Sequence, residues 1–308
     1  MNTRLKLATA ATLAATASAF AEIKINEKFA VSGYISGSAA LTETDGTKDS
    51  FIDVDSVKIA SHVTTEKVTA MASVHTFTSH DPVVLDAFAT YKFSPSTSIT
   101  AGKFLSYLGF EAFDYPNMLQ ISYANTLGAF IPAYHSGVKM DFTSGGTTGG
   151  FAVLDSVYGP TYYKGDGDFD NGPGLEGYVK HVAGDLTLFG AIAYDDGVGG
   201  TTDERLTLDF WAQTKVGKTT LAAEYCHSEL KTGGVKQDGY FWLALAMAPV
   251  NDKWTVTGRV SGGEDAALAP IAGPTPSFYK GTICPAVTIT DNLGLLLECA
   301  RVVEILSK

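Results

Sequence analysis

Apolar and polar residues alternate with a period of two along most of the chain after residue 21. In the stretch 204–216, Leu208 and Phe210 alternate with Thr207 and Asp209. Because successive side chains of a strand point to opposite faces, such a stretch has one apolar face and one polar face. The pattern predicts fifteen strands, approximately at 28–42, 51–63, 67–77, 83–93, 97–105, 130–142, 149–158, 174–182, 185–194, 204–216, 218–229, 238–249, 253–262, 278–290 and 293–304.

The connections between the predicted strands also alternate in length. After even-numbered strands most are tight: 64–66, 94–96, 184, 217, 251–252 and 291–292. After odd-numbered strands most are long: 43–50, 106–129, 159–173, 195–203 and 263–277. Bacterial outer-membrane barrels have short periplasmic turns and longer outer loops. We therefore predict an all-β fold, a transmembrane antiparallel up-and-down β-barrel with its N-terminus in the periplasm. A soluble sandwich or propeller, which is the alternative, does not require this alternation.

The strand count departs from the usual barrel. Bacterial single-chain barrels have even strand numbers, and fifteen is odd. We therefore expect a barrel of about 16 strands, of which fifteen are visible in the pattern. Either the pattern hides one strand, or the closing strand is missing from the sequence.

The N-terminal segment 1–21 has the composition of an export signal. It carries two basic residues near its start, an Ala-rich apolar stretch over 7–17, and small residues at Ala19 and Ala21. Charged, apolar and small-residue regions in this order are typical of a secretory signal peptide. We expect this segment to be removed, which leaves a single β-barrel domain over 22–308. The alternative is a buried N-terminal helix.

Composition narrows the class of protein further. Of 308 residues, 22 are basic and 33 are acidic, and the net charge of −11 becomes −13 without the two basic residues of the signal. An acidic, exported chain argues against a nucleic-acid partner. No apolar run approaches the roughly 20 residues of a membrane-spanning helix. If the protein lies in a membrane, it must cross with strands closed into a barrel.

Three cysteines, Cys226, Cys284 and Cys299, are too few and too scattered for a disulfide framework. Cys284 and Cys299 fall near each other on a predicted terminal hairpin. The alternation places these two side chains on opposite faces of the wall, so we expect free thiols.

The long connection 106–129 is too aromatic for a solvated tether. It contains Phe110, Phe113, Tyr115 and Tyr123. Long ordered loops tend to be functional. We expect this loop to fold into the barrel lumen or to pack against a neighbouring subunit.

The segment 102–142 carries a motif that spans this loop and its two flanking strands. Its residues are Gly109, Glu111, Asn117, Ser122, Tyr123 and Leu127, followed by Pro132, Tyr134, His135, Gly137 and Val138. These residues resemble the OmpL-like β-barrel porin-2 family. The resemblance implies an outer-membrane porin of a Gram-negative bacterium, a passive diffusion channel for small hydrophilic solutes or ions in contact with outer-membrane lipid. It also implies a homotrimer as one candidate assembly.

Charges that face the lumen are the functional candidates, because a pore selects solutes with charges at its constriction. The pore-lining or constriction candidates are Lys103, Glu111, Asp114, Asn117, His135, Lys139 and Arg259. If the loop folds inward, its two carboxylates face basic wall residues and set a transverse field across the pore. We predict that reversing both Lys103 and Lys139 to Glu shifts the reversal potential toward cations. For Glu111, Asn117 and His135 the alternative is a role as loop anchors, hydrogen-bonded to the wall.

The glycine-rich stretch 165–174 holds Asp166, Asp168 and Asp170 at every second position. Alternate carboxylates in such a loop can surround Ca²⁺ with oxygen ligands. The spacing is not that of an EF-hand, because Asn171 stands where that loop requires glycine. The stretch is therefore a candidate Ca²⁺ site, and the alternative is solvated surface charge. No other cofactor is expected.

Catalytic motifs give no support to an enzyme. His135 and Ser136 are adjacent on a predicted strand, so their side chains point to opposite faces and cannot act as a pair. The sequence contains no nucleophile elbow, Walker loop or metalloprotease motif. The alternatives to a diffusion channel are a structural or anchoring barrel with a plugged lumen and, less favoured, an outer-membrane hydrolase.

Overall fold

The computed structural model describes residues 5–14, 22–44, 46–77, 80–124, 130–159, 172–198, 203–264 and 276–306. Most of these residues lie in strands, and the 3-10 turn Tyr115–Asn117 is the helical element whose bounds the described ranges contain. No helix in the described ranges is long and apolar enough to cross a membrane.

The strands follow the period-two pattern of the sequence. Their bounds are β1 Leu5–Ala14, β2 Ile23–Lys24, β3 Phe29–Thr44, β4 Thr47–Thr64, β5 Val68–Phe77, β6 His80–Ser94, β7 Thr97–Leu105, β8 Tyr134–Ser144, β9 Thr147–Leu154, β10 Gly174–Ala183, β11 Leu186–Asp196, β12 Glu204–Val216, β13 Thr219–Thr232, β14 Val235–Pro249, β15 Trp254–Glu264, β16 Pro276–Thr290 and β17 Leu293–Leu306. The fifteen predicted strands are confirmed as β3 to β17, each with ends within four residues of the prediction.

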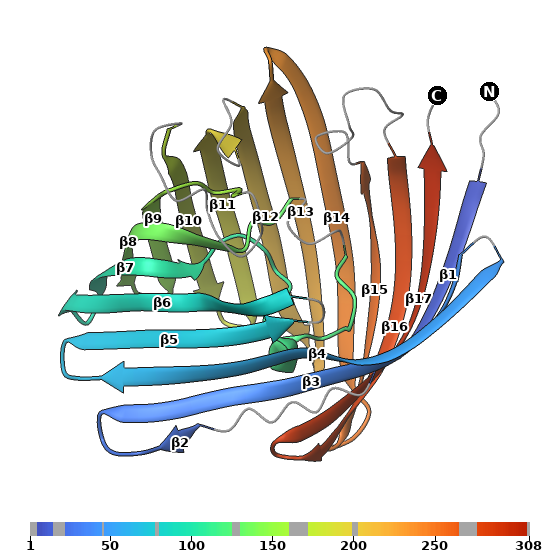
Figure 1. The fold of residues 1–308 in the computed structure, drawn as a ribbon, viewed down its shortest axis with the longest axis horizontal. Helices are drawn as coiled ribbons and strands as arrows, with labels where there is room; N and C mark the ends of the chain where they lie inside the picture. The colour runs from blue at the N-terminus through green and yellow to red at the C-terminus, as the bar shows by residue number, and fades with distance from the viewer. Residues whose placement is uncertain are drawn as a thin grey trace.

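The sheet is antiparallel and up-and-down. From β3 to β17 each strand pairs with the one before it and the one after it in the chain. The remaining long strand, β1, pairs with both β17 and β3, so the hydrogen-bonded pairings return to their starting strand. Figure 1 shows β1 beside β17, with β3 and β4 crossing in front. Sixteen long strands therefore surround one interior.

The sixteenth position is occupied by residues assigned above to an export signal. Leu5–Ala14 pairs along its whole length with β17, and six of its residues pair with the end of β3. The pairing belongs to the unprocessed chain. It does not test the expectation that segment 1–21 is removed.

Inward and outward faces differ in polarity. On β12, Arg205, Thr207 and Asp209 are at most 3% exposed, whereas Leu206 and Phe210 are 37% and 52% exposed. The outward face of the other strands is similarly apolar, with exposed Ile35, Ile59, Val138, Phe151, Val179, Ile192, Val260 and Ile283. This is the arrangement of a barrel that faces lipid outside and water or polar groups inside.

Exposed aromatic residues collect near both ends of the outer surface. Tyr91, Phe93 and Phe142 lie close to the turns that follow β6 and β8, and Tyr279 lies near the opposite end, at the start of β16. Rings at these two levels are the interfacial girdles expected of a transmembrane barrel.

The turns that follow the even-numbered strands are all tight and lie at one end of the barrel. After even-numbered β4 to β16 the connections have two to four residues, and Gly184 and Gly217 adopt φ values of +60° and +62° in two-residue turns. Such φ values strain every residue except glycine, which explains its use there. The long connections that follow β7 and β9 begin at the opposite end.

The predicted long connection over 43–50 is wrong. Thr44 ends β3 and Thr47 begins β4, so the strands continue into a two-residue hairpin. Charged and polar residues here obscure the period-two pattern, but Glu43 pairs in register with Lys48 and Gly46 supplies a φ of +82° for the turn. The gap predicted between 229 and 238 is likewise a tight turn at Gly233 and Gly234.

The three cysteines are free thiols, as predicted. Cys226 and Cys284 are buried and Cys299 is exposed on the other face of the wall.

Candidate functional site: the loop inside the barrel

The connection between β7 and β8, residues 106–133, runs inside the barrel. Figure 1 shows it crossing the interior in front of β12 to β14 and reaching β4. Outside the 3-10 turn its backbone has no regular ladder, so its N–H groups need partners from elsewhere. Residues 125–129 lie outside the described ranges; the contacts of the remainder define the site.

Carboxylates of the wall accept hydrogen bonds from the outgoing arm of the loop. Glu176 on β10 accepts from the Tyr107 N–H at 3.2 Å, Asp209 on β12 from the Gly109 N–H at 2.8 Å, and Glu224 on β13 from the Phe110 N–H at 2.8 Å. Each carboxyl group satisfies a backbone N–H that the irregular loop would otherwise leave without a partner. Three neighbouring parts of the wall therefore hold this arm.

The returning arm is held by a second group of wall residues. Glu298 on β17 accepts hydrogen bonds from the backbone N–H groups of Ile121 at 2.8 Å and Ser122 at 3.1 Å, and from the Ser122 hydroxyl. Lys280 on β16 donates to the carbonyl of Tyr123 at 2.7 Å. This arm is therefore fixed by both an acidic and a basic wall residue.

The two carboxylates of the loop contact cations of the wall directly. Glu111 forms an ion pair with Arg259 on β15, and its other oxygen accepts from the Ala124 N–H at 2.7 Å. Asp114 lies 2.7 Å from Lys58 on β4. The prediction that Glu111 and Asp114 approach basic wall residues identified Arg259 correctly. Both contacts are ion pairs without an intervening opening.

Lys58 does more than neutralise Asp114. Its Nζ also lies 3.2 Å from Asp86 on β6, and its side chain is 5% exposed. A buried cation between two carboxylates is better compensated than one with a single partner. This cluster joins the loop to β4 and β6, which lie across the interior from β13 in Figure 1.

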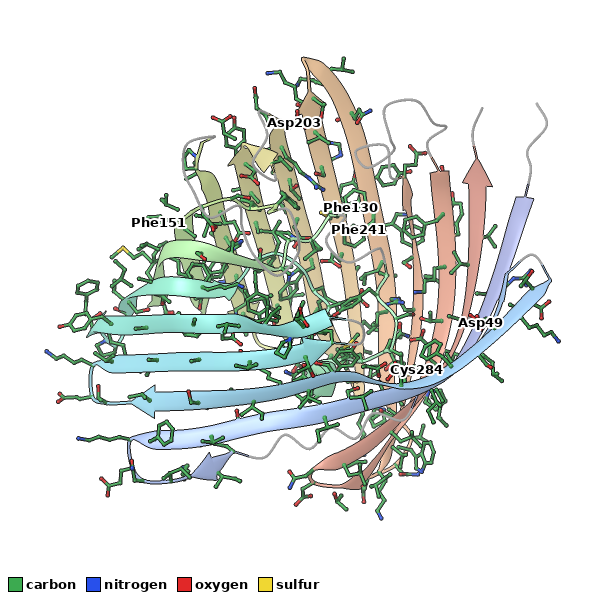
Figure 2. The ribbon with its side chains drawn as sticks, in the orientation of Figure 1. Asp49, Phe130, Phe151, Asp203, Phe241 and Cys284 are labelled. Atoms are coloured by element: carbon green, nitrogen blue, oxygen red, sulfur yellow. The ribbon has the colours of Figure 1, made fainter. Side chains whose placement is uncertain are left out.

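Apolar contacts fill the space between the loop and the wall. Phe130 of the loop and Phe241 of β14 are fully buried, with ring centroids 5.4 Å apart, and Figure 2 shows them side by side. Phe110 packs edge-on against Trp211 of β12 at 5.6 Å. The predicted inward fold of an aromatic loop is therefore observed.

The start of the loop packs against Lys139 of β8. Its Nζ lies 4.5 Å from the ring centroid of Phe104 and 4.8 Å from that of Tyr107. The Tyr107 hydroxyl donates to Asp141 at 2.9 Å. Burial, reinforced by the Asp141 charge, raises the pKa of Tyr107 well above its usual range, so the phenol keeps its proton. Lys139 therefore lies on the inward face, as predicted.

Lys103 does not reach this site, which corrects the expectation that it lines the pore. It pairs in register with Ala87 and Ser136 and donates to the carbonyl of Val84 at 2.7 Å, on the outer face of β7. Phe104, its neighbour, is the residue that points inward and is buried. The sequence assignment failed because glycine at position 102 leaves the apolar face of this short strand ambiguous.

The other predicted residues take different places. Asn117 ends the 3-10 turn and is exposed, and its side chain makes no hydrogen bond to another described residue. His135 is fully buried, with Nε2 3.6 Å from Glu176. Glu111 contacts Arg259 and Asp114 contacts Lys58, whereas Asp166, Asp168 and Asp170 lie outside the described ranges. Within those ranges no group of three or more His, Cys, Asp or Glu is placed to hold a metal ion.

The wall residues Glu176, Glu224 and Glu298 were missed by the sequence reasoning. Each occupies an inward position on an alternating strand and is 4% exposed or less. An acidic residue at such a position was the available signal. What the sequence lacks is the identity of the loop N–H group that each one faces.

Fold and site together define an outer-membrane porin of a Gram-negative bacterium, a passive diffusion channel for small hydrophilic solutes. The sequence matches the family model described as "Putative beta-barrel porin-2, OmpL-like" over residues 56–303. Since the match spans most of the chain, the chain belongs to this family, as the loop motif indicated. No curated protein matches the sequence.

Solved structures agree on the fold. OmpT of Vibrio cholerae is 13% identical, with a TM-score of 0.62 over 92% of this chain and 100% of that one. The anion-selective porin from Comamonas acidovorans is 13% identical, with a TM-score of 0.53 over 99% and 98%. Salmonella typhi OmpF, solved with daunomycin, is 11% identical, with a TM-score of 0.55 over 98% and 96%.

Proposed function

We propose that the loop 106–133 is the constriction of this channel and that the wall carboxylates hold it in a fixed position. The observation that carries the proposal is the set of hydrogen bonds from loop N–H groups to Glu176, Asp209, Glu224 and Glu298. A loop held at several points around the wall does not open and close on its own. It therefore narrows the lumen permanently. Solutes then pass beside it by diffusion, with no conformational cycle.

We further propose that the channel discriminates weakly between ions. Glu111 and Asp114 are neutralised by Arg259 and Lys58, so neither supplies an isolated charge to a passing ion. The net charge of −13 in a processed chain favours a mild cation preference through the long-range field. Catalysis has no part in this function, and the channel role needs no cofactor.

Export and assembly complete the proposal. Segment 1–21 is a signal peptide that is cleaved after Ala21, and the processed barrel assembles as a homotrimer. Cleavage removes β1, so β3 and β17 become the two edges that have to meet in the processed barrel. One of the Vibrio cholerae OmpT structures is described as a trimer form, which supports this assembly as a candidate. The intact mass of protein purified from outer membranes tests the cleavage, and its oligomer mass tests the trimer.

Glu298→Gln provides the test of the constriction. The amide keeps the shape of the side chain but loses the charge and one acceptor, so the hydrogen bonds from Ile121 and Ser122 weaken by about 2 kcal/mol. We expect larger and noisier single-channel conductance in planar bilayers. Glu229→Gln is the matched control, because Glu229 forms an ion pair with Lys236 and is 31% exposed. Exposed ion pairs contribute little.

The outcomes separate the alternatives. Larger, noisier steps in Glu298→Gln alone support the loop as the constriction. Identical conductance in all three proteins would show that the current does not pass beside this arm. A folded barrel without any conductance would favour the plugged, anchoring barrel.

A further inference from the structure

A cavity lies between the two arms of the loop and the wall. Its volume is about 190 Å³, and its lining includes Phe110, Asn117 and Gln120 from the loop with Gln213 of β12 and Leu245 of β14. Gln213 stands four residues beyond Asp209 on the same face of β12, toward the turn at Gly217. The cavity is therefore beside the proposed constriction, on its short-turn side.

Two carboxamides in this lining have unused hydrogen-bonding capacity. Neither the Asn117 side chain nor the Gln213 side chain forms a hydrogen bond to another described residue. Each amide offers two N–H donors and one carbonyl acceptor. One belongs to the loop and the other to the wall, so a solute between them can both donate and accept on two sides.

The cavity offers no uncompensated charge. Glu111 also lines it, but one carboxylate oxygen pairs with Arg259 and the other accepts from the Ala124 N–H. Gln120 is engaged as well, since its carbonyl accepts from Thr282 at 2.7 Å. An ionic solute would find no free counter-charge in this cavity. A neutral solute does not need one.

One side of the cavity is apolar. The Phe110 ring and the Leu245 side chain both line it, and Leu245 is 5% exposed. A few convergent polar groups beside an apolar surface are the usual composition of a small-molecule site. The ring of a sugar has this same division, with hydroxyl groups around its edge and C–H groups on its faces.

We propose that this cavity is a binding site for a neutral, hydroxyl-rich solute of the size of a hexose, taken up during its passage through the channel. The proposal rests on the proposed role of the loop as the constriction. Asn117 and Gln213 hydrogen-bond the hydroxyl groups, and Phe110 contacts the C–H face. Bound solute then occupies part of the conducting path.

Glucose is the probe for the test. Single-channel conductance of the outer-membrane protein is recorded in KCl with increasing glucose and divided by the conductivity of each bulk solution. Polyethylene glycol of the same hydrodynamic size is the non-binding comparison. We expect glucose, and not the polymer, to reduce the corrected conductance along a saturating curve.

Substitutions locate the effect. Asn117→Leu and Gln213→Leu should each raise the half-saturating glucose concentration at least fivefold. Gln237→Leu is the matched control, because Gln237 lies on the same face of β14 as Leu245 but eight residues away, roughly 27 Å along the strand. That variant should behave like the wild type.

Several outcomes would overturn the site. A corrected conductance that falls equally with glucose and polymer excludes binding, and so does a saturating effect that both Leu variants leave unchanged. If a Leu variant does not fold, Asn117→Ala and Gln213→Ala replace it, and removal of the amide should raise the half-saturating glucose concentration as well.

A second measurement separates this site from the channel proposal. Trp211 contacts Phe110, so tryptophan fluorescence in detergent reports glucose binding without any current. Saturating fluorescence without conductance would support the site and contradict the constriction proposal. Conductance that responds to Glu298→Gln but not to glucose would support the constriction and contradict the site.

Discussion

At the scale of single residues, the electrostatic potential of the interior depends on which charges are paired. Arg259 and Lys58 each contact a loop carboxylate, whereas Lys139 lies over the rings of Phe104 and Tyr107. A cation over the face of an aromatic ring is attracted by it. Lys139 lies on the inward face, so its charge acts on the potential near the start of the loop. Lys103 is separated from the lumen by the wall itself.

Reversing these two lysines one at a time distinguishes the two faces. We expect Lys139→Glu to move the reversal potential in a tenfold KCl gradient toward the cation limit, because an inward cation becomes an anion. Lys103→Glu should leave the reversal potential unchanged. A shift in Lys103→Glu equal to that in Lys139→Glu would contradict the outward placement of Lys103.

At the scale of single elements, β7 carries the loop and depends on one glycine. Gly102 has a φ of +127°, and a Cβ atom there would lie 2.2 Å from the Ala87 carbonyl oxygen of β6. The close approach of β6 and β7 sets the register of the strand that begins the loop. Any side chain at position 102 must displace the backbone of β6. Backbone moves less easily than the end of a flexible side chain.

Gly102→Ala should therefore destabilise the barrel by about 1–3 kcal/mol. Gly258→Ala in β15 is the control, because a Cβ atom there meets nothing within 4 Å. The measurement is the urea midpoint of folding into lipid vesicles, followed by the heat-dependent change in gel mobility. Equal midpoints for the two variants would mean that β6 and β7 are not packed as closely as the structure has them.

At the scale of the whole molecule, the barrel separates lipid outside from a polar interior. On β11 the exposed residues Leu186, Leu188 and Ile192 share the outward face, while Ala191, Ala193 and Asp195 are buried on the other. Leu186 begins the strand beside the tight turn, and Ile192 lies farther into the wall. Depth in the bilayer therefore changes along one face of one strand.

A lysine scanned along this face should report that depth. Ile192→Lys is expected to destabilise the barrel folded in vesicles by about 2–4 kcal/mol, because a charge near the bilayer midplane is costly. Leu186→Lys, nearer the interface, should cost only about 0–1 kcal/mol. A cost at Leu186 equal to or above that at Ile192 would contradict the assignment of this face to the bilayer.

The sequence by itself determined the fold class and the two faces of the wall. Period-two alternation is a local property, so Leu206 and Phe210 could be separated from Thr207 and Asp209 without knowledge of any partner strand. Local reading failed where polarity did not alternate, as in the hairpin at Gly46, and where a short strand left its faces ambiguous, as at Lys103.

The tertiary structure alone decided how the site is built. Glu224 meets the Phe110 N–H across 114 positions of sequence, and Glu298 meets Ile121 across 177. Such partners depend on the register of many strands and on the path of an irregular loop, and neither leaves a periodic signal in the chain. The aromatic residues of the loop indicated that it is buried; only the closed wall around it determined which carboxylates hold it.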